Sequence, residues 1–483
     1  NNVILLESKE KLGGMAATEE FTPGYKCNLI YDYIPWINKE LIEKLHLDQY
    51  GLEFLPIDPL RISLDKNGKH ISFFENPEKT ATSISQHSTK DAEKWTYFTQ
   101  YIAKLTQFLE PIYNTTPPAI SEFGLGDILA IKSMLKPLKN HGTRGLVDIL
   151  RTAPMMMPEL MDEWFESDLL RGSLSASGII HITQGPYSAA TVLNFLHQHI
   201  YSNGSIYSAQ FVKGGTDMLT QVLGKSAHDS GVEIRLGSQV SSIICNNGVC
   251  TGVNTVDGKT YAGNKIISGL DPTQTCIKLI GANKLSPTFY RQLKNIKYRG
   301  SAARVHFALN KIPKIIGVTT DQMGSVFSIN PSIEYLERAY DDAKYGHFSE
   351  NPYIEFSIPS IANPNFAPRG KHVLSTTIQY VPYSLNNDNL DFNYKEQITR
   401  NLIHILGRYI PGFSDMIENS TLMTPADFEV SLGLSEGNFN HGEMTLDQFF
   451  FMRPTMSCSQ YRTPIKNLFL CGPGTHPGGG LHG

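Results

Sequence analysis

Residues 467–483, with the sequence NLFLCGPGTHPGGGLHG, hold the densest group of glycines in the chain. The apolar run at 468–470 comes first and predicts a buried strand. The glycine-rich turn after it predicts the start of a helix, where main-chain N–H groups and the positive end of the helix dipole are available. Such a turn can bind an anion or the electron-rich edge of a ring. A purely structural glycine loop is the alternative.

A second group of residues that could do chemistry lies near the start of the chain. Residues 3–7, VILLE, predict a short buried strand that ends in Glu7, and Gly13 and Gly14 follow soon after it. An acid at the end of such a strand can accept hydrogen bonds from the ribose hydroxyls of an adenine dinucleotide. The glycine pair lets a phosphate or a sugar approach the main chain without a Cβ in the way. An ordinary strand end followed by a turn is the alternative interpretation.

Two other motifs imitate ligand sites. Segment 124–130, GLGDILA, looks like a nucleotide-binding loop, but Pro117 and Pro118 stand where the preceding strand should be. We therefore predict a helix start there. His197 and His199 belong to a predicted helix and face different sides of it, which disfavours a shared metal ion. We predict no metal site.

The elements that must position these groups follow from periodicity and turn signals. Apolar residues recur at helical spacing over 89–108, 127–138, 146–151 and 189–201, which predicts a largely helical middle part. A KGGT turn at 213–216 precedes a predicted helix over 218–230 and a strand over 232–236. NNG and DG turns predict hairpins between 239 and 267. Antiparallel strands are predicted over 304–309, 353–358 and 373–380, and a helix over 394–409.

Composition limits the class of protein. A chain of 483 residues is long enough for two or three packed units, so we predict a multi-domain globular protein. The 42 basic and 46 acidic side chains give a net charge of -4, which argues against disorder and against a polybasic nucleic-acid surface. No apolar run reaches the roughly 18 residues of a membrane-spanning helix, so no transmembrane segment is predicted, although peripheral membrane contact stays open.

Cysteine usage bears on the compartment. The six cysteines contain no CxxC pair and are too sparse to staple a chain of this length. A reducing compartment, the cytoplasm or the mitochondrial matrix, is therefore predicted.

The chain resembles the phytoene desaturase-like FAD-dependent oxidoreductases, most closely the branch that includes the pyridine nucleotide-disulphide oxidoreductase domain 2 proteins. The matches run nearly from end to end and keep their order. Beside the glycine-rich tail they comprise LE at 6–7, LGG at 12–14, PGY at 23–25, KGGT at 213–216, GVEI at 231–234, QV at 239–240, IISGLDP at 266–272, NHGEMTLDQ at 440–448, RP at 453–454 and YRTPI at 461–465.

The resemblance implies a fold class and a domain division. The expected fold is α/β, with a glutathione-reductase-like, Rossmann-type FAD-binding domain and a mixed α+β substrate domain. The FAD-binding domain would be discontinuous and comprise residues 1–75, 203–300 and 420–483. The substrate domain would comprise a helical part, 76–202, and an antiparallel sheet, 301–419.

The resemblance also implies roles for single residues around FAD. Glu7 would hold the adenosine ribose, and Val240 would pair with adenine through its main chain. The glycines would lie along the rest of the cofactor: Gly13 and Gly14 at the diphosphate and ribityl side, Gly269 near the adenosine or diphosphate, Gly472 and Gly474 along the ribityl and diphosphate, and Gly479 and Gly480 with N–H groups toward the pyrimidine edge of the flavin.

Some parts of the family pattern are absent from these residues. The family has a strand and a G-x-G-x-x-G loop about 20 residues before the ribose acid, whereas Glu7 is the seventh residue here. The family's flavin-contacting helix also continues past the position of Gly483. We therefore expect these 483 residues alone to fold but to retain little flavin. Pro473 stands where related amine oxidases have an acid, which the desaturase-like branch also lacks, and Met15 stands where many relatives have a basic residue.

The function that the resemblance implies is hydride removal from a small apolar or amine-like substrate to flavin N5, with reoxidation by a separate electron acceptor. His441 and Arg453 are the polar candidates for a catalytic role near the flavin, with a structural role as the alternative for each. Two rival functions stay open at this point. One is a flavin amine oxidase, and the other is an inactive, flavoprotein-derived binding or scaffold protein.

Overall fold

The computed structural model describes residues 2–119, 124–202, 204–207, 209–384 and 393–482. Its largest sheet has seven strands in the order β17–β13–β16–β15–β14–β5–β6. Their bounds are β5 (Arg61–Ser63), β6 (Ile71–Phe73), β13 (Ala302–Leu309), β14 (Val326–Ile329), β15 (Tyr353–Ser357), β16 (His372–Gln379) and β17 (Ile417–Met423). The β14–β5 pair is parallel, and the other pairs are antiparallel. The strands predicted at 304–309, 353–358 and 373–380 are confirmed.

Helices cover this sheet and close its core. On α13 (Tyr394–Gly407), Ile398, Leu402 and Ile405 recur at helical spacing and are buried. They pack into one cluster with sheet residues such as Phe307. Burying such an apolar stripe is the main source of stability of an amphipathic helix. α11 (Ile333–Lys344) contributes to another cluster that also contains Tyr353 of the sheet. The helix predicted at 394–409 is therefore confirmed.

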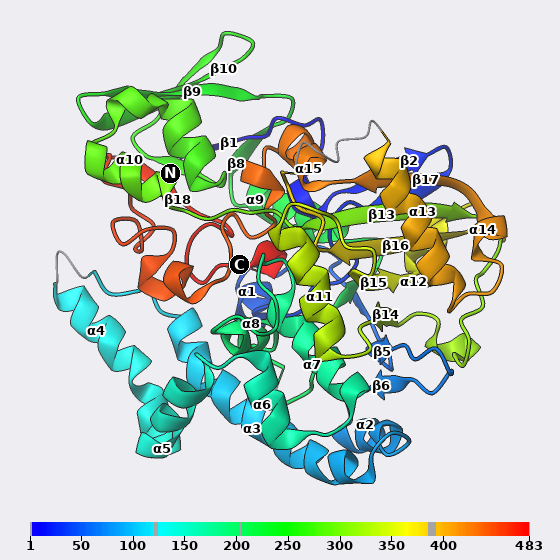
Figure 1. The fold of residues 1–483 in the computed structure, drawn as a ribbon. Coiled ribbons are helices and arrows are strands. Elements are labelled where there is room, and N and C mark those ends of the chain that lie inside the picture. The colour runs from blue at the N-terminus through cyan, green and yellow to red at the C-terminus, as the bar shows by residue number, and fades with distance from the viewer. Residues whose placement is uncertain (1, 120–123, 203, 208, 385–392, 483) are drawn as a thin grey trace.

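The middle of the chain is helical, as predicted. It comprises α2 (Pro77–Ile84), α3 (Thr89–Tyr113), α4 (Leu125–Met134), α5 (Lys136–Thr152), α6 (Met157–Trp164), α7 (Asp168–Ile179) and α8 (Thr191–Gln198). These helices form the lower part of Figure 1. The Ser88 side chain caps α3 by accepting a hydrogen bond from the Asp91 N–H at 3.1 Å. Gly124 is the residue before α4, so the loop that resembles a nucleotide site is a helix start.

Short parallel pairs and a hairpin sheet make up the remaining part. β1 (Val3–Leu6) pairs with β8 (Val232–Arg235), and β12 (Ile266–Ser268) pairs with β18 (Leu468–Leu470), both in parallel. β9 (Val240–Asn246), β10 (Val249–Thr255) and β11 (Thr260–Ala262) form an antiparallel sheet. Asn247, Gly248 and Gly258 have positive φ in the predicted hairpin turns. α9 (Asp217–Asp229) precedes β8, as expected from the KGGT turn.

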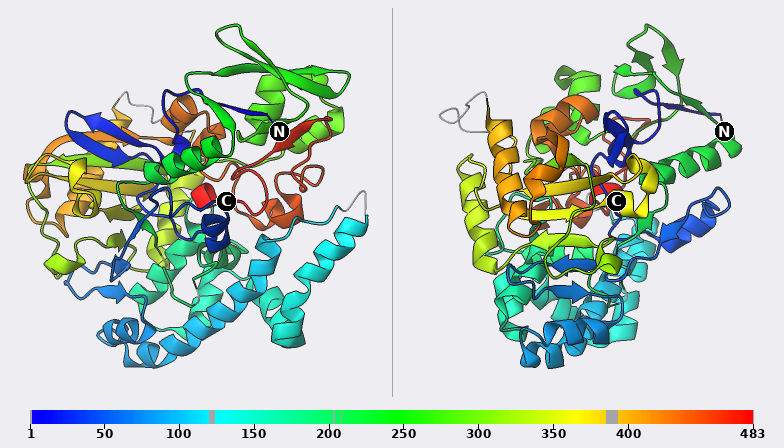
Figure 2. Two further views of the ribbon diagram at one scale, coloured as in Figure 1. Left: turned by 180° about the vertical axis from the view of Figure 1, so that it is seen from behind. Right: turned by 90° about the vertical axis from the view of Figure 1, so that its right-hand side faces the viewer.

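Smaller elements join these parts. They are β2 (Thr18–Thr22), β3 (Tyr25–Asn28), α1 (Lys39–Lys44), β4 (Phe54–Leu55), β7 (Phe211–Val212), α10 (Pro287–Lys294), α12 (Pro359–Ala362), α14 (Phe413–Met416) and α15 (Pro425–Leu432). The red C-terminal segment lies centrally, where the helical part, the large sheet and the hairpin part meet (Figures 1 and 2). No helix among the described residues combines the length and the apolar character needed to cross a bilayer.

The N-terminal strand differs from its prediction as a buried strand. Val3, Ile4 and Leu5 of β1 are 47%, 42% and 39% exposed. The reason is that β1 is hydrogen-bonded to β8 along one edge, and its faces stay largely open to solvent. The strand at the other end of the sequence follows its prediction, since Leu468 and Leu470 of β18 are buried.

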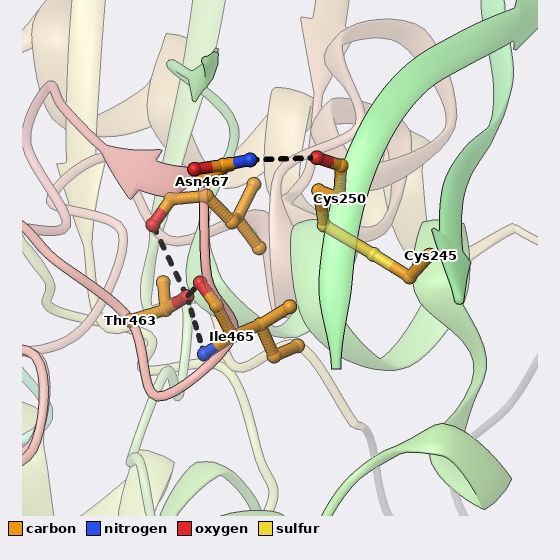
Figure 3. The surroundings of a disulfide bond; sticks show 6 residues. Cys245, Cys250, Thr463, Ile465 and Asn467 are labelled. Atoms are coloured by element: carbon orange, nitrogen blue, oxygen red, sulfur yellow. Dashed lines mark hydrogen bonds between the residues drawn. A yellow bond between two sulfur atoms is a disulfide. The ribbon is translucent and has the colours of Figure 1, made fainter. Parts of the chain in front are cut away.

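The cysteines include one disulfide, which sequence reasoning did not predict. Cys245 and Cys250 face each other on β9 and β10 and are joined, with 4.3 Å between their Cα atoms (Figure 3). The bridge links neighbours on adjacent strands and does not staple distant parts of the chain. Asn467, just before β18, donates from its side chain to the Cys250 carbonyl at 3.3 Å and ties this hairpin to the tail (Figure 3).

The large sheet also contains strands that lie outside the segments predicted for the substrate domain. β5 and β6 come from the segment 1–75, and β17 extends across position 420. The division into residues 1–75, 203–300 and 420–483 on one side and 76–202 and 301–419 on the other stays a prediction.

Candidate functional site

The glycine-rich tail forms a loop directly after β18. The Cys471 N–H donates to the Ser268 carbonyl at 2.9 Å, which extends the parallel pairing with β12 by one residue. The predicted helix start is absent from the described part of the tail, which ends instead in a 3₁₀ turn, Gly480–His482. Gly478, Gly479 and Gly480 all have positive φ, so these three residues do not themselves form a turn of right-handed α-helix.

The parallel β12–β18 pair brings together two of the predicted glycines. A Cβ added to Gly472 would have the Gly269 carbonyl oxygen at 3.5 Å as its nearest neighbour. Gly472 has a φ of 84° and therefore favours glycine. These two positions leave the carboxyl ends of neighbouring parallel strands free of side chains. Ligands in open α/β sheets bind at that edge.

Arg453 holds the tail loop against the NHGE segment, 440–443. Its guanidinium donates to five main-chain carbonyls, those of Pro473, Asn440, Gly442, Glu443 and Gln448. The side chain is 2% exposed, and no carboxylate of the described residues forms a salt bridge with it. Burial lowers the pKa of Arg453 to about 10, so the side chain remains cationic at neutral pH.

His441 lies beside the tail. A Cβ added to Gly474 would lie 3.3 Å from the His441 Cβ. Burial lowers the pKa of His441 to about 4, so its imidazole is neutral at pH 7. Its Nδ1 is buried without a hydrogen-bond partner among the described residues.

His476, within the tail, is likewise a buried and neutral imidazole. Burial lowers the pKa of His476 to about 4. Its Nε2 lies 2.9 Å from the Ile112 carbonyl, and its Nδ1 has no partner among the described residues. Because the carbonyl can only accept, Nε2 carries the proton and Nδ1 offers a lone pair.

An aromatic cluster that sequence reasoning missed borders the end of the tail. A side chain at Gly480 would collide with the Tyr31 hydroxyl. The Tyr31 ring meets those of His181 and Phe439 edge-on, with centroids 6.1 and 6.3 Å away. These three residues come from distant parts of the chain and stand in no periodic pattern, so no sequence signal identified them.

The N-terminal candidates gather around β1 and β8. The Glu7 N–H donates to the Arg235 carbonyl at 2.9 Å, and the Glu7 carbonyl accepts from the Ser238 N–H at 2.7 Å, two residues before Val240. Glu7 and Val240 therefore lie at the same end of this parallel pair. The Glu7 carboxylate is half-buried and accepts the Lys9 N–H at 2.9 Å.

The glycine pair at 13–14 forms the start of a 3₁₀ turn, Gly14–Ala16. Gly14 has a φ of 52°, and a Cβ there would meet no atom within 4 Å. The Thr216 hydroxyl donates to the Ala16 carbonyl at 3.0 Å, so the KGGT segment holds this turn in place. Open space next to a positive-φ glycine is what a closely approaching phosphate or sugar requires.

The residues present fit a bound flavin nucleotide. Side-chain-free backbone lies at Gly14, Gly269 and Gly472, where a ligand can approach the main chain. Two buried imidazole nitrogens beside the tail, His441 Nδ1 and His476 Nδ1, have no partner in the described structure. Buried polar atoms are nearly always hydrogen-bonded, so orphaned atoms around a glycine loop point to a polar ligand there.

Comparisons with known proteins agree with this geometry. A pyridine nucleotide-disulfide oxidoreductase domain-containing protein 2 from Rattus norvegicus is 28% identical, covering 100% of this chain and 87% of the relative. A lycopene-forming phytoene desaturase from Pseudescherichia vulneris is 22% identical, over 99% and 91%. The crystal structure of an oxidoreductase from Methanosarcina mazei superimposes with a TM-score of 0.60 at 15% identity and covers 98% of this chain and 89% of its own.

These findings confirm the predicted fold class and the resemblance to desaturase-like flavoproteins. The family model for flavin containing amine oxidoreductases matches residues 1–483. That match confirms the predicted oxidoreductase class and the flavin cofactor. The chain belongs to the flavin containing amine oxidoreductase family.

Proposed function

We propose that the protein is an FAD-dependent oxidoreductase that removes a hydride from an apolar substrate. The observation that carries the proposal is the tail loop. Arg453 fixes its positive-φ glycines next to buried imidazole nitrogens that have no partner among the described residues. A relative named as a phytoene desaturase supports an apolar substrate. A bound flavin supplies the redox chemistry, the acceptance of a hydride at N5. A separate electron acceptor is part of the proposal.

The proposal assigns the cofactor contacts to both ends of the chain. Glu7 accepts hydrogen bonds from the adenosine ribose, and the main chain of Val240 pairs with adenine. Gly13 and Gly14 border the diphosphate together with Gly269, Gly472 and Gly474. Gly479 and Gly480 would offer N–H groups to the pyrimidine edge of a bound flavin, where such donors would stabilise negative charge. The proposed FAD-binding unit is the discontinuous segment set given above.

In this proposal Arg453 and His441 are positioning residues. Within the described structure Arg453 donates its hydrogen bonds to main-chain carbonyls, so its proposed role is to hold the loop and to add positive charge near the cofactor. His441 and His476 have pKa values lowered to about 4 by burial and are neutral at pH 7. Neutral imidazoles without a proton-transfer partner suit hydride removal from a carbon centre that needs little acid–base help.

The experiment has two parts. Flavin released from the purified full-length protein is identified by mass spectrometry, where FAD is expected and FMN alone would contradict the adenosine contacts. The protein is then mixed anaerobically with an isoprenoid hydrocarbon or with an aliphatic diamine, and the flavin absorption is followed. Bleaching by the hydrocarbon supports the proposal. Bleaching by the diamine alone would favour amine oxidation, and a flavin-free full-length protein would favour the scaffold alternative.

A further inference from the structure

A small cavity lies between the large sheet and the helical part. Its volume is about 30 Å³, which is room for about two water molecules. The lining includes Tyr33, Arg61, Ile180, His199, Tyr207 and Tyr353. These residues come from β5, β15, the ends of α7 and α8, and the loops near 33 and 207. The cavity therefore lies where segments predicted for the FAD-binding domain meet segments predicted for the substrate domain.

The charges at this cavity cancel. Arg61 forms an ion pair with Glu355 at 2.6 Å, and both side chains are less than a tenth exposed. The Tyr33 and Tyr353 hydroxyls donate to the Glu355 carboxylate at 2.8 and 3.0 Å. Burial acts to raise the pKa of Glu355, but Arg61 and these hydrogen bonds outweigh it and lower that pKa below its usual value. A net-neutral cavity gives no preference to an ammonium or a carboxylate.

Two buried polar atoms of the lining residues lack partners. His199 Nδ1 lies 2.6 Å from the Phe195 carbonyl, so Nδ1 carries the proton and Nε2 is a bare acceptor. Burial lowers the pKa of His199 to about 4, which keeps the imidazole neutral. Arg61 Nε is an N–H donor, and neither it nor His199 Nε2 has a hydrogen-bond partner in the described structure. Arg61 and His199 both contact the Tyr207 ring.

The cavity adjoins the aromatic cluster at the end of the tail. Ile180 lines the cavity, and the next residue, His181, packs its ring against Tyr31. Glu355 is close enough to His181 to act on its pKa, because the carboxylate raises it while burial lowers it to about 4. Tyr31 in turn lies against Gly480. The wall of the cavity and the aromatic cluster beside the tail are thus direct neighbours in the structure.

We propose that this cavity is a substrate subsite for a neutral hydroxyl group on an otherwise apolar substrate. A hydroxyl oxygen accepts from Arg61 Nε–H, and its proton is donated to His199 Nε2, so one group satisfies both orphaned atoms. The hydroxyl anchors the substrate and is not the reacting group. This inference rests on the proposed function, because it names the class of substrate that the same site accepts.

Four-carbon probes test the subsite without relying on turnover. Binding of 1-butanol, butylammonium, butanoate and 1-fluorobutane to the purified protein is compared by saturation-transfer NMR. We expect 1-butanol to bind several-fold more tightly than the other three. The cavity filled only by water at saturating 1-butanol in a crystal structure, or equal binding of butylammonium or butanoate, would overturn the subsite.

Variants assign the two contacts. His199→Phe keeps an aromatic ring without the acceptor and should weaken 1-butanol binding about three- to tenfold, the effect of one hydrogen bond. His199→Gln retains an acceptor and should restore affinity to near wild type. Arg61→Lys keeps the charge facing Glu355 but lacks the Nε donor and should weaken binding to a similar extent. His228→Phe, at an exposed position, is the matched control.

The outcomes for the subsite and for the proposed function are separable. Unchanged 1-butanol affinity in both His199→Phe and Arg61→Lys would refute the subsite even if the protein carries FAD and oxidises a hydrocarbon. A full-length protein without FAD would refute the proposed function, while selective, variant-sensitive 1-butanol binding would still support the cavity as a hydroxyl site.

Discussion

Arg453 donates two hydrogen bonds to one acceptor, the main-chain carbonyl of Pro473, from Nε at 3.1 Å and from Nη2 at 2.7 Å. Pro473 is the second residue of the glycine-rich loop after Cys471. The same guanidinium also reaches Gly442 and Gln448, so one buried cation fixes three segments at once. A side chain at position 478 would collide with Arg453, which explains why this residue of the loop is glycine.

Replacing Arg453 tests this arrangement. Arg453→Lys keeps the charge but cannot reach five carbonyls with one ammonium group. Since hydrogen bonds to charged groups contribute roughly 1.5–3 kcal/mol each and at least two are lost, the free energy of unfolding should fall by at least about 3 kcal/mol. Urea denaturation measures this change. Arg369→Lys, at an exposed position, is the control, and equal losses in both variants would contradict a special role for Arg453.

Gly480 is the position where a side chain should act most directly on flavin binding. Gly480→Val places a branched side chain against the Tyr31 hydroxyl and on a backbone with a φ of 59°. We expect flavin content after purification to fall strongly, and Gly479→Val, with a φ of 91°, to behave alike. Flavin per chain is measured by absorbance. Gly407→Val, where added atoms meet nothing within 4 Å and φ is ordinary, should retain wild-type flavin content.

Predictions from the sequence were most accurate where a motif depends on local backbone geometry. The glycine tail, the KGGT turn and the hairpins at Gly248 and Gly258 lie where turn chemistry places them, because a positive φ is a property of one residue and its neighbours. The apolar stripe on α13 could also be predicted, because helical spacing of apolar residues is a property of one short segment. The helix expected after the tail stays a prediction, because the described residues end in the 3₁₀ turn directly after the glycines.

Long-range partnerships could not be predicted in this way. Arg61 and Glu355 are 294 positions apart, on β5 and β15, which both pair with β14; the strand order and register of the sheet, not a motif, decide that they meet. Tyr31, His181 and Phe439 meet only because three separate segments converge on the tail. The exposure of β1 was missed because an apolar run shows that a strand can be buried. It does not show what covers the strand.

Glu7 is the sharpest test of the adenosine assignment. Glu7→Ala should weaken FAD binding by roughly 1.5–3 kcal/mol, the contribution of a charge-assisted hydrogen bond. The dissociation constant, measured by flavin fluorescence during titration of flavin-free protein, should rise accordingly, whereas FMN binding should not change. Glu43→Ala, at an exposed position on α1, is the control. An unchanged dissociation constant for FAD would show that Glu7 is only a strand end.

Stability should also fall in mild acid because of the buried, neutral histidines. Burial lowers the pKa of His476 from 6.5 to about 4 in the folded protein, and the side chain is 2% exposed. Below pH 6.5 His476 therefore binds a proton in the unfolded chain, whereas in the folded chain it does so only below about pH 4. The free energy of unfolding therefore falls as the pH drops through this window. Between pH 7 and pH 5 the loss for this one group is about 2 kcal/mol.

His476→Phe removes that proton-linked loss. The ring still packs against Phe450, but the hydrogen bond to the Ile112 carbonyl is gone, so the variant should be less stable than wild type at pH 7. From pH 7 to pH 5 it should then lose about 2 kcal/mol less than wild type, because no imidazole is protonated on unfolding at this position. Urea denaturation at both pH values gives the two differences. The exposed His228→Phe should follow the wild-type pH dependence. If His476→Phe followed it as well, His476 would titrate in the folded protein and could not be the neutral acceptor beside the tail.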